Sequence, residues 1–591
     1  MKMVMGWKDN PIVYLTLKTW EYSNGNRKQL WLILLLFLIA NLISLLEPLV
    51  VAKILNTIQE QGLTQEVLPT LTIYLMMFLG ITVLFWIFHG PARVLEEKLA
   101  FLVKANYKKH LIEGTLHLPI TWHADHHSGD TIDKTEKGTN ALYDYASELS
   151  AVIETLVLFI GSYIALVYFN IHASYLILFL AIITGTIILK FDKALSKQYR
   201  KLFRIENKIS AKVFDVISNV TTVVILRVED LLAKAIHRRV MSPYQLFLKN
   251  NKLNELKWFA VSVLTTLMII SVLLSFIYFH VKTGVPVLIG TVYALYGYVS
   301  RINELFFRFA FRYGNIVKRK SRVMNAEEIT KEFLPVENLN RKKLHNWKIV
   351  EIKNLNFSYT GKGLHLIAVN MTIKRNQRIA FIGASGSGKT TMLKVMRELY
   401  VPQNVEVHLD GEKMPHGFRN ISHEITLIPQ DPEIFATTIQ ENITLGVSHI
   451  LKYIRHYTDL ACFTEVAERL PKQFASAINE KGVNLSGGEK QRLALARGLM
   501  ACEDKSIVLL DEPTSSVDSR NELLIYQNIF KEFKDKTIIS SIHRLHLLPI
   551  FDKIYFFKRG KIIAFGSFDE MLKHPEFRKM WERYTKSQKM R

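Results

Sequence analysis

The sequence predicts a multidomain protein in which an all-α, six-helix membrane domain is followed by an α/β domain. Six segments in the first half are apolar over about the 20 residues that a helix needs to cross a bilayer, or close to it. Beyond residue 347, strand-like and helix-like segments alternate, which is typical of α/β domains. A chain of 591 residues is also too long for one core, and 49% hydrophobic with 22% charged residues suits a membrane part joined to a polar part.

The net charge and the cysteine content indicate which partner and which compartment to expect. The formal net charge is +23, but the basic residues lie mostly beside the apolar segments. Anionic membrane lipid is therefore the expected partner, and no nucleic-acid partner is expected. The two cysteines, Cys462 and Cys502, both lie in the second half, so we expect no disulfide framework and a reducing compartment for that half.

The beginning of the chain is expected to form its own segment, residues 1–28. It contains basic residues but no small-residue cleavage site after an apolar run, so no removable signal is expected. Residues 11–20 are amphipathic and are expected to lie along the membrane surface.

The expected membrane domain, residues 29–323, carries the six spans. The third and fourth spans nearly touch, as do the fifth and sixth, so these two links are tight turns at one membrane face. The connections 89–148 and 190–257 are long and lie at the other face, where we expect the helices to continue. The expected spans are Leu30–Val51, Val67–Phe88, Leu149–Phe169, Ile171–Leu189, Trp258–Val281 and Val285–Val299.

Charge assigns the two faces. The connection 190–257 holds 15 Lys or Arg residues, whereas the short turns hold Lys282 alone. The positive-inside rule therefore places the long connections and both termini in the cytoplasm. We expect a multi-pass protein of a bacterial plasma membrane.

A few charged or polar residues interrupt the expected spans. Charges within a membrane are costly, so such residues commonly line a pathway for cargo. The alternative is that Arg301 and Glu304 pair with each other and only hold helices together, and the sequence leaves both readings open. The residues concerned are Glu47, Glu154, Tyr293, Tyr296, Ser300, Arg301 and Glu304.

A polar linker is expected over residues 324–346, and the α/β domain over residues 347–591. The clearest elements of this α/β domain are strand-like segments and helix-like segments. Those expected to form strands are Ile349–Phe357, Arg378–Ile382 and Ile507–Leu510, and those expected to form helices are Thr390–Leu399 and Gly488–Leu499.

A glycine-rich stretch, Gly383–Thr391, reads G-A-S-G-S-G-K-T-T and joins one such strand to a helix. This arrangement forms a phosphate cradle, because the backbone N–H groups and the helix N-terminus favour an anion. Lys389 is expected to reach the terminal phosphates, and Thr390 to bind Mg²⁺. The expected contacts to the nucleotide are Gly383, Ser385, Gly386, Ser387, Gly388, Lys389, Thr390 and Thr391.

The apolar strand near residue 510 ends in two acidic residues. Asp511 suits a carboxylate that holds Mg²⁺, and Glu512 suits a general base that polarises the attacking water. Taken alone, the pattern could be an ordinary strand followed by a turn.

A second anion-binding helix start is expected at Leu485–Arg492, which reads L-S-G-G-E-K-Q-R. One nucleotide does not need two cradles from the same subunit. This stretch resembles the signature sequence of the ATP-binding cassette (ABC) family. The resemblance implies that its residues contact ATP held by another subunit, namely Leu485, Ser486, Gly487, Gly488 and Glu489.

The other motifs of the family follow in the expected order. Tyr359 resembles the aromatic residue that stacks on adenine, and Gln430 the residue that links Mg²⁺ and water to the membrane domain. His543 resembles the histidine that contacts the terminal phosphate, and it is an expected catalytic residue together with Glu512 and Lys389.

Two further segments carry the resemblance. Residues 515–518 resemble the loop that crosses the dimer interface, with Asp518 in the expected place, although the family more often has Ala-Leu in its middle. Residues 479–482 resemble the segment that touches the membrane domain in exporters.

The membrane half resembles the exporter branch of the family. Residues 118–122 and 128–130 resemble the region of the first coupling helix, and residues 219–229 lie where the second is expected. His123, His126 and His127, with a neighbouring Asp125, could form a metal cluster, but we expect surface residues of the coupling region.

The resemblance implies an ATP-driven export half-transporter that works as a dimer. Two cassettes would enclose two Mg²⁺-ATP molecules, and their closure would switch the membrane domains between inward-facing and outward-facing states. The catalytic positions are all intact, which favours a homodimer, and a heterodimer stays open. The expected cargo is an amphipathic drug, lipid or peptide. The alternatives are an ATP-gated channel-like or regulatory protein without pumping, and a peripheral assembly factor without cargo.

Overall fold

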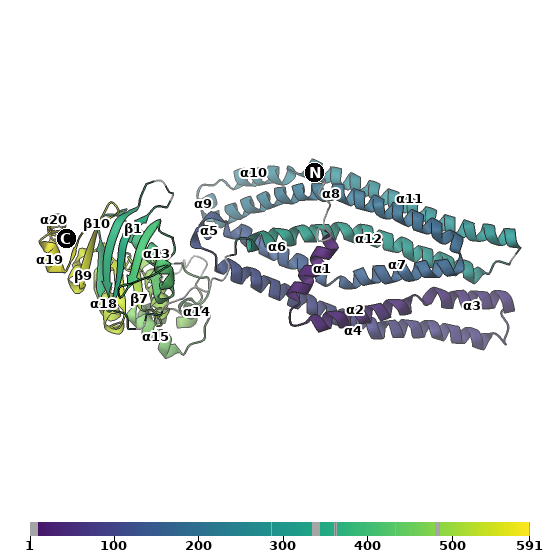
Figure 1. Ribbon diagram of the computed structural model, residues 1–591, viewed down its shortest axis with the longest axis horizontal. Coiled ribbons are helices and arrows are strands. Elements are labelled where there is room, and N and C mark those ends of the chain that lie inside the picture. The colour runs from purple at the N-terminus through teal and green to yellow at the C-terminus, as the bar shows by residue number, and fades with distance from the viewer. Residues whose placement is uncertain are drawn as a thin grey trace. The chain divides into compact units, whose positions relative to one another are not determined.

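The structure, a computed structural model, divides into two compact units (Figure 1). Unit 1 comprises Met1–Leu118 and Trp122–Leu334, and unit 2 comprises Pro119–Thr121 and Pro335–Arg591. The residues that the structure describes are 10–284, 286–333, 343–344, 346–359, 361, 363–431, 433–478 and 485–589.

Unit 1 is built from helices. Four of them are 40 to 49 residues long, and at about 1.5 Å per residue they are much longer than a bilayer core is thick. The helices therefore continue beyond the membrane, as predicted for the long connections. The helices are α1 (Pro11–Tyr22), α2 (Arg27–Ser44), α3 (Glu47–Gln61), α4 (Leu68–Leu116), α5 (Ile120–Asp125), α6 (Ser128–Ala146), α7 (Leu149–Phe169), α8 (Ile171–Ser218), α9 (Val220–Ile225), α10 (Glu229–Met241), α11 (Tyr244–Thr283) and α12 (Ile289–Thr330).

Five helical stretches among the described residues are long and apolar enough to cross a membrane. They are Arg27–Gln61, Leu68–Leu116, Ser128–Phe169, Ile171–Ser218 and Glu229–Thr283. The sixth expected span falls on α12, whose tyrosines, glycines and charged residues make it less apolar than the other five. The chain is thus a multi-pass membrane protein by the length and composition of its helices.

The first expected span is not one helix, because α2 ends at Ser44 and α3 begins at Glu47. Pro48 explains the break, since proline has no N–H to bond the carbonyl of Ser44 and its ring crowds the preceding turn. Arg301 of α12 fills the vacant position, where its Nη1 donates to the Ser44 carbonyl over 2.7 Å. The hydroxyl of Tyr298 donates to the next carbonyl, that of Leu45, over 2.9 Å.

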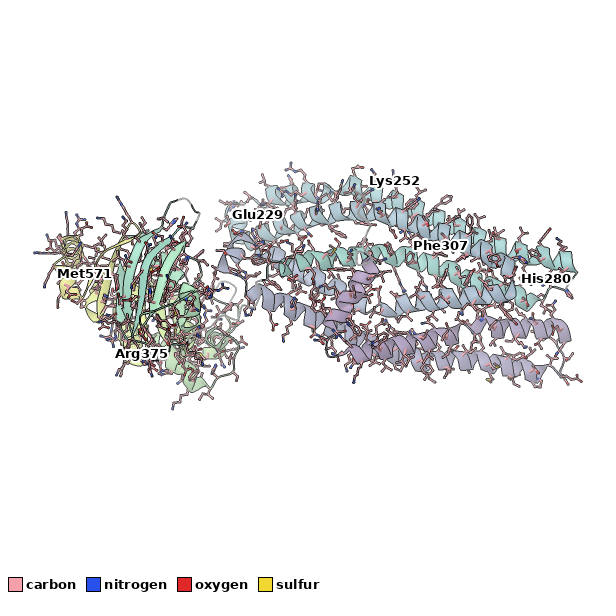
Figure 2. All side chains as sticks on the ribbon, in the orientation of Figure 1. Glu229, Lys252, His280, Phe307, Arg375 and Met571 are labelled. Atoms are coloured by element: carbon pink, nitrogen blue, oxygen red, sulfur yellow. The ribbon has the colours of Figure 1, made fainter. Side chains whose placement is uncertain are left out.

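Helix pairs in unit 1 are joined by aromatic and buried contacts. In Figure 1, α8 runs beside α11, and α4 runs beside α2 and α3. Phe307 of α12 stacks on Trp258 of α11 with ring planes 7° apart, and Figure 2 marks its place near the middle of the unit. A buried ion pair joins Lys257 of α11 to Asp192 of α8 over 3.1 Å, and the same Lys257 Nζ donates to the carbonyl of Ala310 in α12.

Two short helices occupy the expected coupling regions. α5 lies within residues 118–130 and α9 within residues 219–229. The ring of His126 stacks on that of Trp122, and its Nδ1 lies 2.9 Å from the Trp122 carbonyl. The expected linker begins later than predicted, because α12 continues to Thr330.

Unit 2 contains two sheets, with strand orders β2-β1-β4-β5 and β10-β9-β3-β8-β7-β6. The three strands predicted from the sequence are β1, β3 and β7, and β7 ends one residue later than predicted, at Asp511. The strands are β1 (Ile349–Phe357), β2 (Leu366–Lys374), β3 (Arg378–Ile382), β4 (Asn404–Leu409), β5 (Glu412–Lys413), β6 (Ile425–Ile428), β7 (Ile507–Asp511), β8 (Thr537–Ser541), β9 (Lys553–Lys558) and β10 (Lys561–Gly566).

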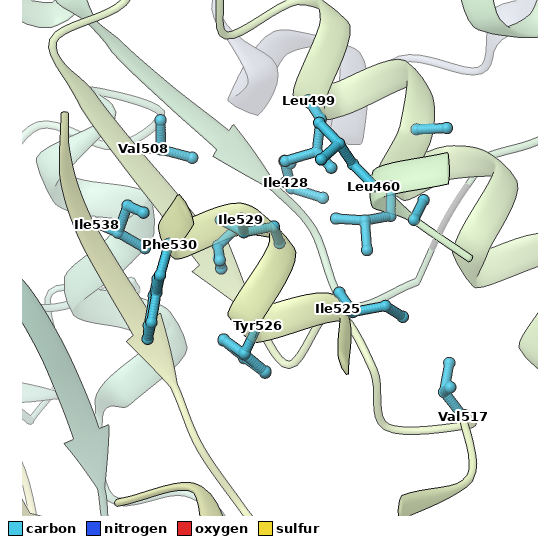
Figure 3. Packing of buried hydrophobic residues seen from close by; sticks show 14 of the residues in the cluster. Ile428, Leu460, Leu499, Val508, Val517, Ile525, Tyr526, Ile529, Phe530 and Ile538 are labelled. Atoms are coloured by element: carbon cyan, nitrogen blue, oxygen red, sulfur yellow. The ribbon is translucent and has the colours of Figure 1, made fainter. Parts of the chain in front are cut away.

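The α-helices of unit 2 are α13 (Lys389–Met396), α14 (Ile439–Thr444), α15 (Leu451–Leu460), α16 (Thr464–Glu468), α17 (Gly487–Met500), α18 (Ser519–Glu532), α19 (Phe568–Leu572) and α20 (Pro575–Lys589). Some of these helices, among them α13, α17 and α19, contact strands of the larger sheet, and α14 and α15 pack on α17. α18 packs Ile525, Tyr526 and Ile529 into the core beside Val508 of β7 and Ile538 of β8 (Figure 3). Each such buried side chain contributes about 1.5–3 kcal/mol relative to exposure.

The order of the larger sheet brings the candidate residues to one edge. β3, β8, β7 and β6 are mutually parallel neighbours. Their carboxyl ends therefore lie at the same edge, where the phosphate loop after β3, the acids at the end of β7 and His543 after β8 come together.

Candidate nucleotide site

The phosphate loop starts where β3 ends. Gly383 has φ +145°, and a Cβ there would lie 2.2 Å from the carbonyl oxygen of Phe557, so only glycine fits. Gly388 has φ +111° and forms the N-cap of α13. The loop thus leads directly into a helix N-terminus, the arrangement that favours phosphate.

Lys389 is held inside this loop. Its Nζ donates to the carbonyls of Gly383 over 2.9 Å and Ala384 over 3.3 Å, and the residue is 4% exposed. Burial lowers the pKa of Lys389, while the charges of Glu512 and Asp511 raise it. Beside it, the hydroxyl of Ser387 is buried and has no partner in the described part of the chain, so it is a spare hydroxyl for a ligand.

Two of the residues predicted to bind Mg²⁺, Thr390 and Asp511, lie next to each other. The hydroxyl of Thr390 donates to Oδ1 of Asp511 over 2.9 Å, and the hydroxyl of Ser541 donates to the same oxygen over 2.8 Å. A carboxylate and a hydroxyl are hard oxygen donors of the kind that Mg²⁺ prefers, so these residues fit the ion.

Glu512 is the centre of the candidate catalytic group. Nε2 of Gln430 donates to its Oε2 over 3.1 Å, and Nε2 of His543 lies 2.6 Å from its Oε1. Its backbone N–H donates to Ser541 Oγ, which fixes the start of the turn, where Glu512 has φ +48°. Burial raises the pKa of Glu512, and the positive charges of His543 and Lys389 oppose this shift. A carboxylate with a raised pKa suits a proton acceptor.

The expected adenine-stacking residue stands at the rim of the loop. Tyr359 is 41% exposed, and its hydroxyl donates to that of Thr391 over 3.3 Å. Phe357, His365 and Tyr400 each meet its ring edge to face. These contacts fix the ring while leaving surface for a base.

The signature stretch begins α17 with a capping box. Ser486 is the N-cap and accepts from the N–H of Glu489, whose carboxylate accepts from the N–H of Ser486 over 2.9 Å. The Ser486 hydroxyl hydrogen is therefore still available for donation. A Cβ on Gly488 would lie 2.7 Å from the carbonyl oxygen of Ser516, so this glycine permits close packing.

Two members of the stretch have structural roles within the chain. The side chain of Leu485 is buried in the core, and that of Glu489 closes the capping box and pairs with Arg469 over 3.1 Å. These contacts position Ser486 and Gly487. Asp518 similarly caps α18, where it accepts from the N–H of Asn521 over 3.0 Å. Residues 479–482 lie outside the described residues.

The sequence did not single out Gln491, which joins three of the motifs. Its Nε2 donates to the carbonyl of Gln430 and to Ser515 Oγ, and its Oε1 accepts from the N–H of Ser516. Arg544, also not predicted, donates to the carbonyls of Ser515 and Val517. Gln491 lies within a recognised motif and Arg544 directly follows His543, and this position in the sequence is the signal that would have found them.

The polar residues of the membrane unit do not form the pair that one of the two readings of the sequence assumed. Arg301 pairs with Glu47 over 2.6 Å and not with Glu304. Arg308 pairs with Glu304 and with Glu154, which joins α12 to α7. The alternative in which Arg301 pairs with Glu304 therefore does not hold. The physical reason is the helix break at Pro48, which leaves the Ser44 carbonyl for Arg301 to bind.

Comparison with known proteins first identifies the class by fold. Over 94% of this chain, the structure matches 99% of a bacterial Atm1-family ABC exporter solved with ATP bound, with a TM-score of 0.81 and 19% sequence identity. This match shows that the chain has the fold of that exporter, with a helical domain followed by a sheet-containing domain.

Family models and relatives then identify the family. Residues 30–300 match the ABC transporter transmembrane region, and residues 366–515 match the ABC transporter family model. A multidrug resistance ABC transporter ATP-binding and permease protein of Lactococcus lactis is 32% identical over 39% of this chain and 40% of its own length. The transport/processing ATP-binding protein ComA of Streptococcus pneumoniae is 25% identical over 81% of this chain and 66% of its own.

The heterocyst differentiation ATP-binding protein HepA of Nostoc is 33% identical over 39% of this chain and 38% of its own length. The alignments with these relatives thus span less than two thirds of the relatives' lengths. The chain belongs to the ABC transporter family, and its two matched regions indicate an ATPase domain joined to a transport domain.

Proposed function

We propose that the protein exports an amphipathic molecule across a membrane by hydrolysing ATP as a dimer. The observation that carries this proposal is the grouping of Lys389, Thr390, Asp511, Glu512 and His543 at one sheet edge of a chain that also carries membrane-spanning helices. The exporter fold and the multidrug and peptide-processing relatives support the same class.

Hydrolysis is assigned to the residues after β7 and β8. Glu512 accepts a proton from the attacking water, and His543 and Gln430 orient the carboxylate. Lys389 leaves the carbonyls of Gly383 and Ala384 to bind the terminal phosphates. Thr390 and Asp511 would hold Mg²⁺, which supplies positive charge to the phosphate oxygens.

The site is proposed to be completed by a second copy of the chain. Ser486 and the N–H groups of Gly487 and Gly488 form an anion-binding helix start that this chain's own cradle does not require. In a symmetric dimer each cradle would face the other copy's signature, and two ATP molecules would be enclosed. Residues near Asp518 would lie between the two copies.

ATP binding would favour the closed cassettes, and closure would turn an inward-facing cavity outward. Hydrolysis would reset the cycle. Both termini are assigned to the cytoplasm by the basic connection 190–257, and the membrane to a bacterial plasma membrane with anionic lipid.

Accumulation of a fluorescent amphipathic dye inside proteoliposomes tests this function. The wild-type chain should concentrate the dye against its gradient only with Mg²⁺ and ATP, and Glu512→Gln should not. Dye that equilibrates across the membrane with ATP but never exceeds the outside concentration would instead establish an ATP-gated channel.

A further inference from the structure

A cavity of about 420 Å³ lies within unit 1 between α4, α7 and α12. Its lining comes from two residues of α4, a short run at the start of α7 and one turn of α12. The α4 and α7 segments lie at the ends of expected spans that face the cytoplasm, Val67–Phe88 and Leu149–Phe169. The lining residues are His89, Arg93, Glu148, Ser150, Ala151, Phe311, Arg312 and Asn315.

Among the described arginines that line the cavity, Arg312 is the one without a hydrogen-bonded carboxylate, and the charge of Glu148 acts on it only through space. Both carboxylate oxygens of Glu148 accept from Arg319, each over 2.8 Å. Arg93 pairs with Glu96 and with Glu97. Nη1 of Arg312, by contrast, is buried and has no hydrogen-bond partner in the described part of the chain.

Other polar groups converge on the same space. Nδ1 of His89 is also buried without a partner among the described residues. Ser150 and Asn315 add a hydroxyl and an amide to the lining. A buried N–H group without a partner is costly, and an anion that enters the cavity and accepts from Nη1 of Arg312 removes this cost.

The rim of the cavity is apolar on the side of α12. Phe311 is 65% exposed although it adjoins this polar lining. A volume of about 420 Å³ is at the small end of the range for ligand pockets, so it admits a head group and leaves a long alkyl chain outside. The ligand that matches both parts has an anionic head and an apolar tail.

We propose that this cavity binds the carboxylate or phosphate head of an anionic amphipathic cargo, with Arg312 as its main ligand and His89 as a second donor. A guanidinium binds both kinds of anion through two parallel N–H···O bonds. The inference rests on the proposed export function, because it assigns the chemical class of the cargo.

Direct binding to the full chain in nanodiscs of neutral phosphatidylcholine, without nucleotide, tests the inference. The probes are dodecyl phosphate and dodecanoate, with dodecyl maltoside, dodecyltrimethylammonium and inorganic phosphate for comparison, and empty nanodiscs give the background. Wild type should bind the two anionic amphiphiles more tightly than the other three probes. Arg312→Gln should weaken their binding by about tenfold or more, because a charge-assisted pair is lost.

Two further variants keep the test specific. Arg312→Lys retains the charge and should lose less affinity than Arg312→Gln. Arg322→Gln is the matched control on the same helix, since Arg322 lies over the ring of Phe203 and does not line the cavity. It should bind both anionic probes as wild type does, and a thermal unfolding midpoint close to that of wild type would show that each variant is folded.

Equal affinity of Arg312→Gln and wild type would overturn the inference, and so would equal binding of inorganic phosphate and dodecyl phosphate. These failures are distinct from failure of the proposed function. A protein that concentrates a neutral or cationic dye but does not bind dodecyl phosphate contradicts only the inference. A protein that binds dodecyl phosphate but concentrates no dye contradicts the export function.

Discussion

Nε2 of Gln430 donates a hydrogen bond to Oε2 of Glu512 over 3.1 Å, although the two residues are 82 positions apart in the sequence. Gln491 supports both residues, because its side chain donates to the carbonyl of Gln430 and to Ser515 in the loop after Glu512. The candidate base is thus connected to the two neighbouring motifs before any ligand enters.

Replacing the candidate base should stop turnover without removing ATP binding. Glu512→Gln keeps the size of the side chain but cannot accept a proton, so we expect ATP hydrolysis to fall by about 10²–10⁴-fold. Hydrolysis and retained nucleotide are measured on the purified chain. Glu532→Gln, which changes an exposed carboxylate paired with His456, is the matched control and should hydrolyse normally. Near wild-type hydrolysis by Glu512→Gln would make the base assignment wrong.

The pH dependence of ATP hydrolysis should follow the protonation of Glu512. Burial raises its pKa, and only the deprotonated form accepts a proton, so activity should fall as the pH drops through this raised pKa. The nearby charge of His543 lowers the pKa of Glu512. His543→Ala should therefore move the acid limb of the residual activity to higher pH.

The control for this shift is His456→Ala, which removes an exposed histidine of the same unit. It should leave the midpoint of the acid limb where it is. A midpoint that stays fixed in His543→Ala, or moves to lower pH, would contradict the electrostatic link between His543 and Glu512.

Gln491→Ala should destabilise unit 2. The change removes the hydrogen-bond partner of the Gln430 carbonyl and of the Ser516 N–H. The side chain that is lost lies in a largely buried place, because Gln491 is only 7% exposed. An unsatisfied buried group costs about 1–3 kcal/mol. Thermal unfolding of the full chain with and without ATP measures the loss, and Gln527→Ala on the exposed side of α18 should change little. Equal midpoints for the two variants would refute the linking role of Gln491.

Arg301 should contribute more to stability while Pro48 breaks the helix. Arg301→Gln removes the donor to the Ser44 carbonyl and the partner of Glu47, so we expect a lower unfolding temperature. Pro48→Ala restores an N–H that can satisfy Ser44 itself. Arg301→Gln should therefore cost less in the Pro48→Ala background, with a coupling of about 0.5–3 kcal/mol in a double-mutant cycle. Additive effects would show that the two residues act independently.

The short motifs were predictable from the sequence, because each is determined by residues that lie close together in the chain. The loop at Gly383 and the acids at Asp511 are recognisable from a strand, a turn and a helix start within about ten residues. The capping role of Glu489 could also have been predicted, since a serine three residues before a glutamate is the pattern of a capping box. The resemblance assigned that glutamate to ATP instead.

Long-range pairs were not predictable in the same way. Arg301 and Glu304 are three residues apart on one helix, which suggested a pair, but the vacant carbonyl of Ser44 lies 257 positions away. The buried pair Asp192–Lys257 was not predicted, because both residues lie in the charged connection 190–257 that was assigned to the cytoplasmic face. Partner choice in these cases depends on which helices pack together, and hydropathy alone does not fix that.

The central claim is that each ATP site is shared between two copies of the chain. Lys389→Ala and Ser486→Arg should each abolish ATP trapping in homodimers, because every site then lacks one half. Random mixing of the two chains should restore trapping at about a quarter of the wild-type sites, since half of the dimers are mixed and each has one intact site. Trapping that stays at zero in the mixture, although mixed dimers are present, would contradict the shared site.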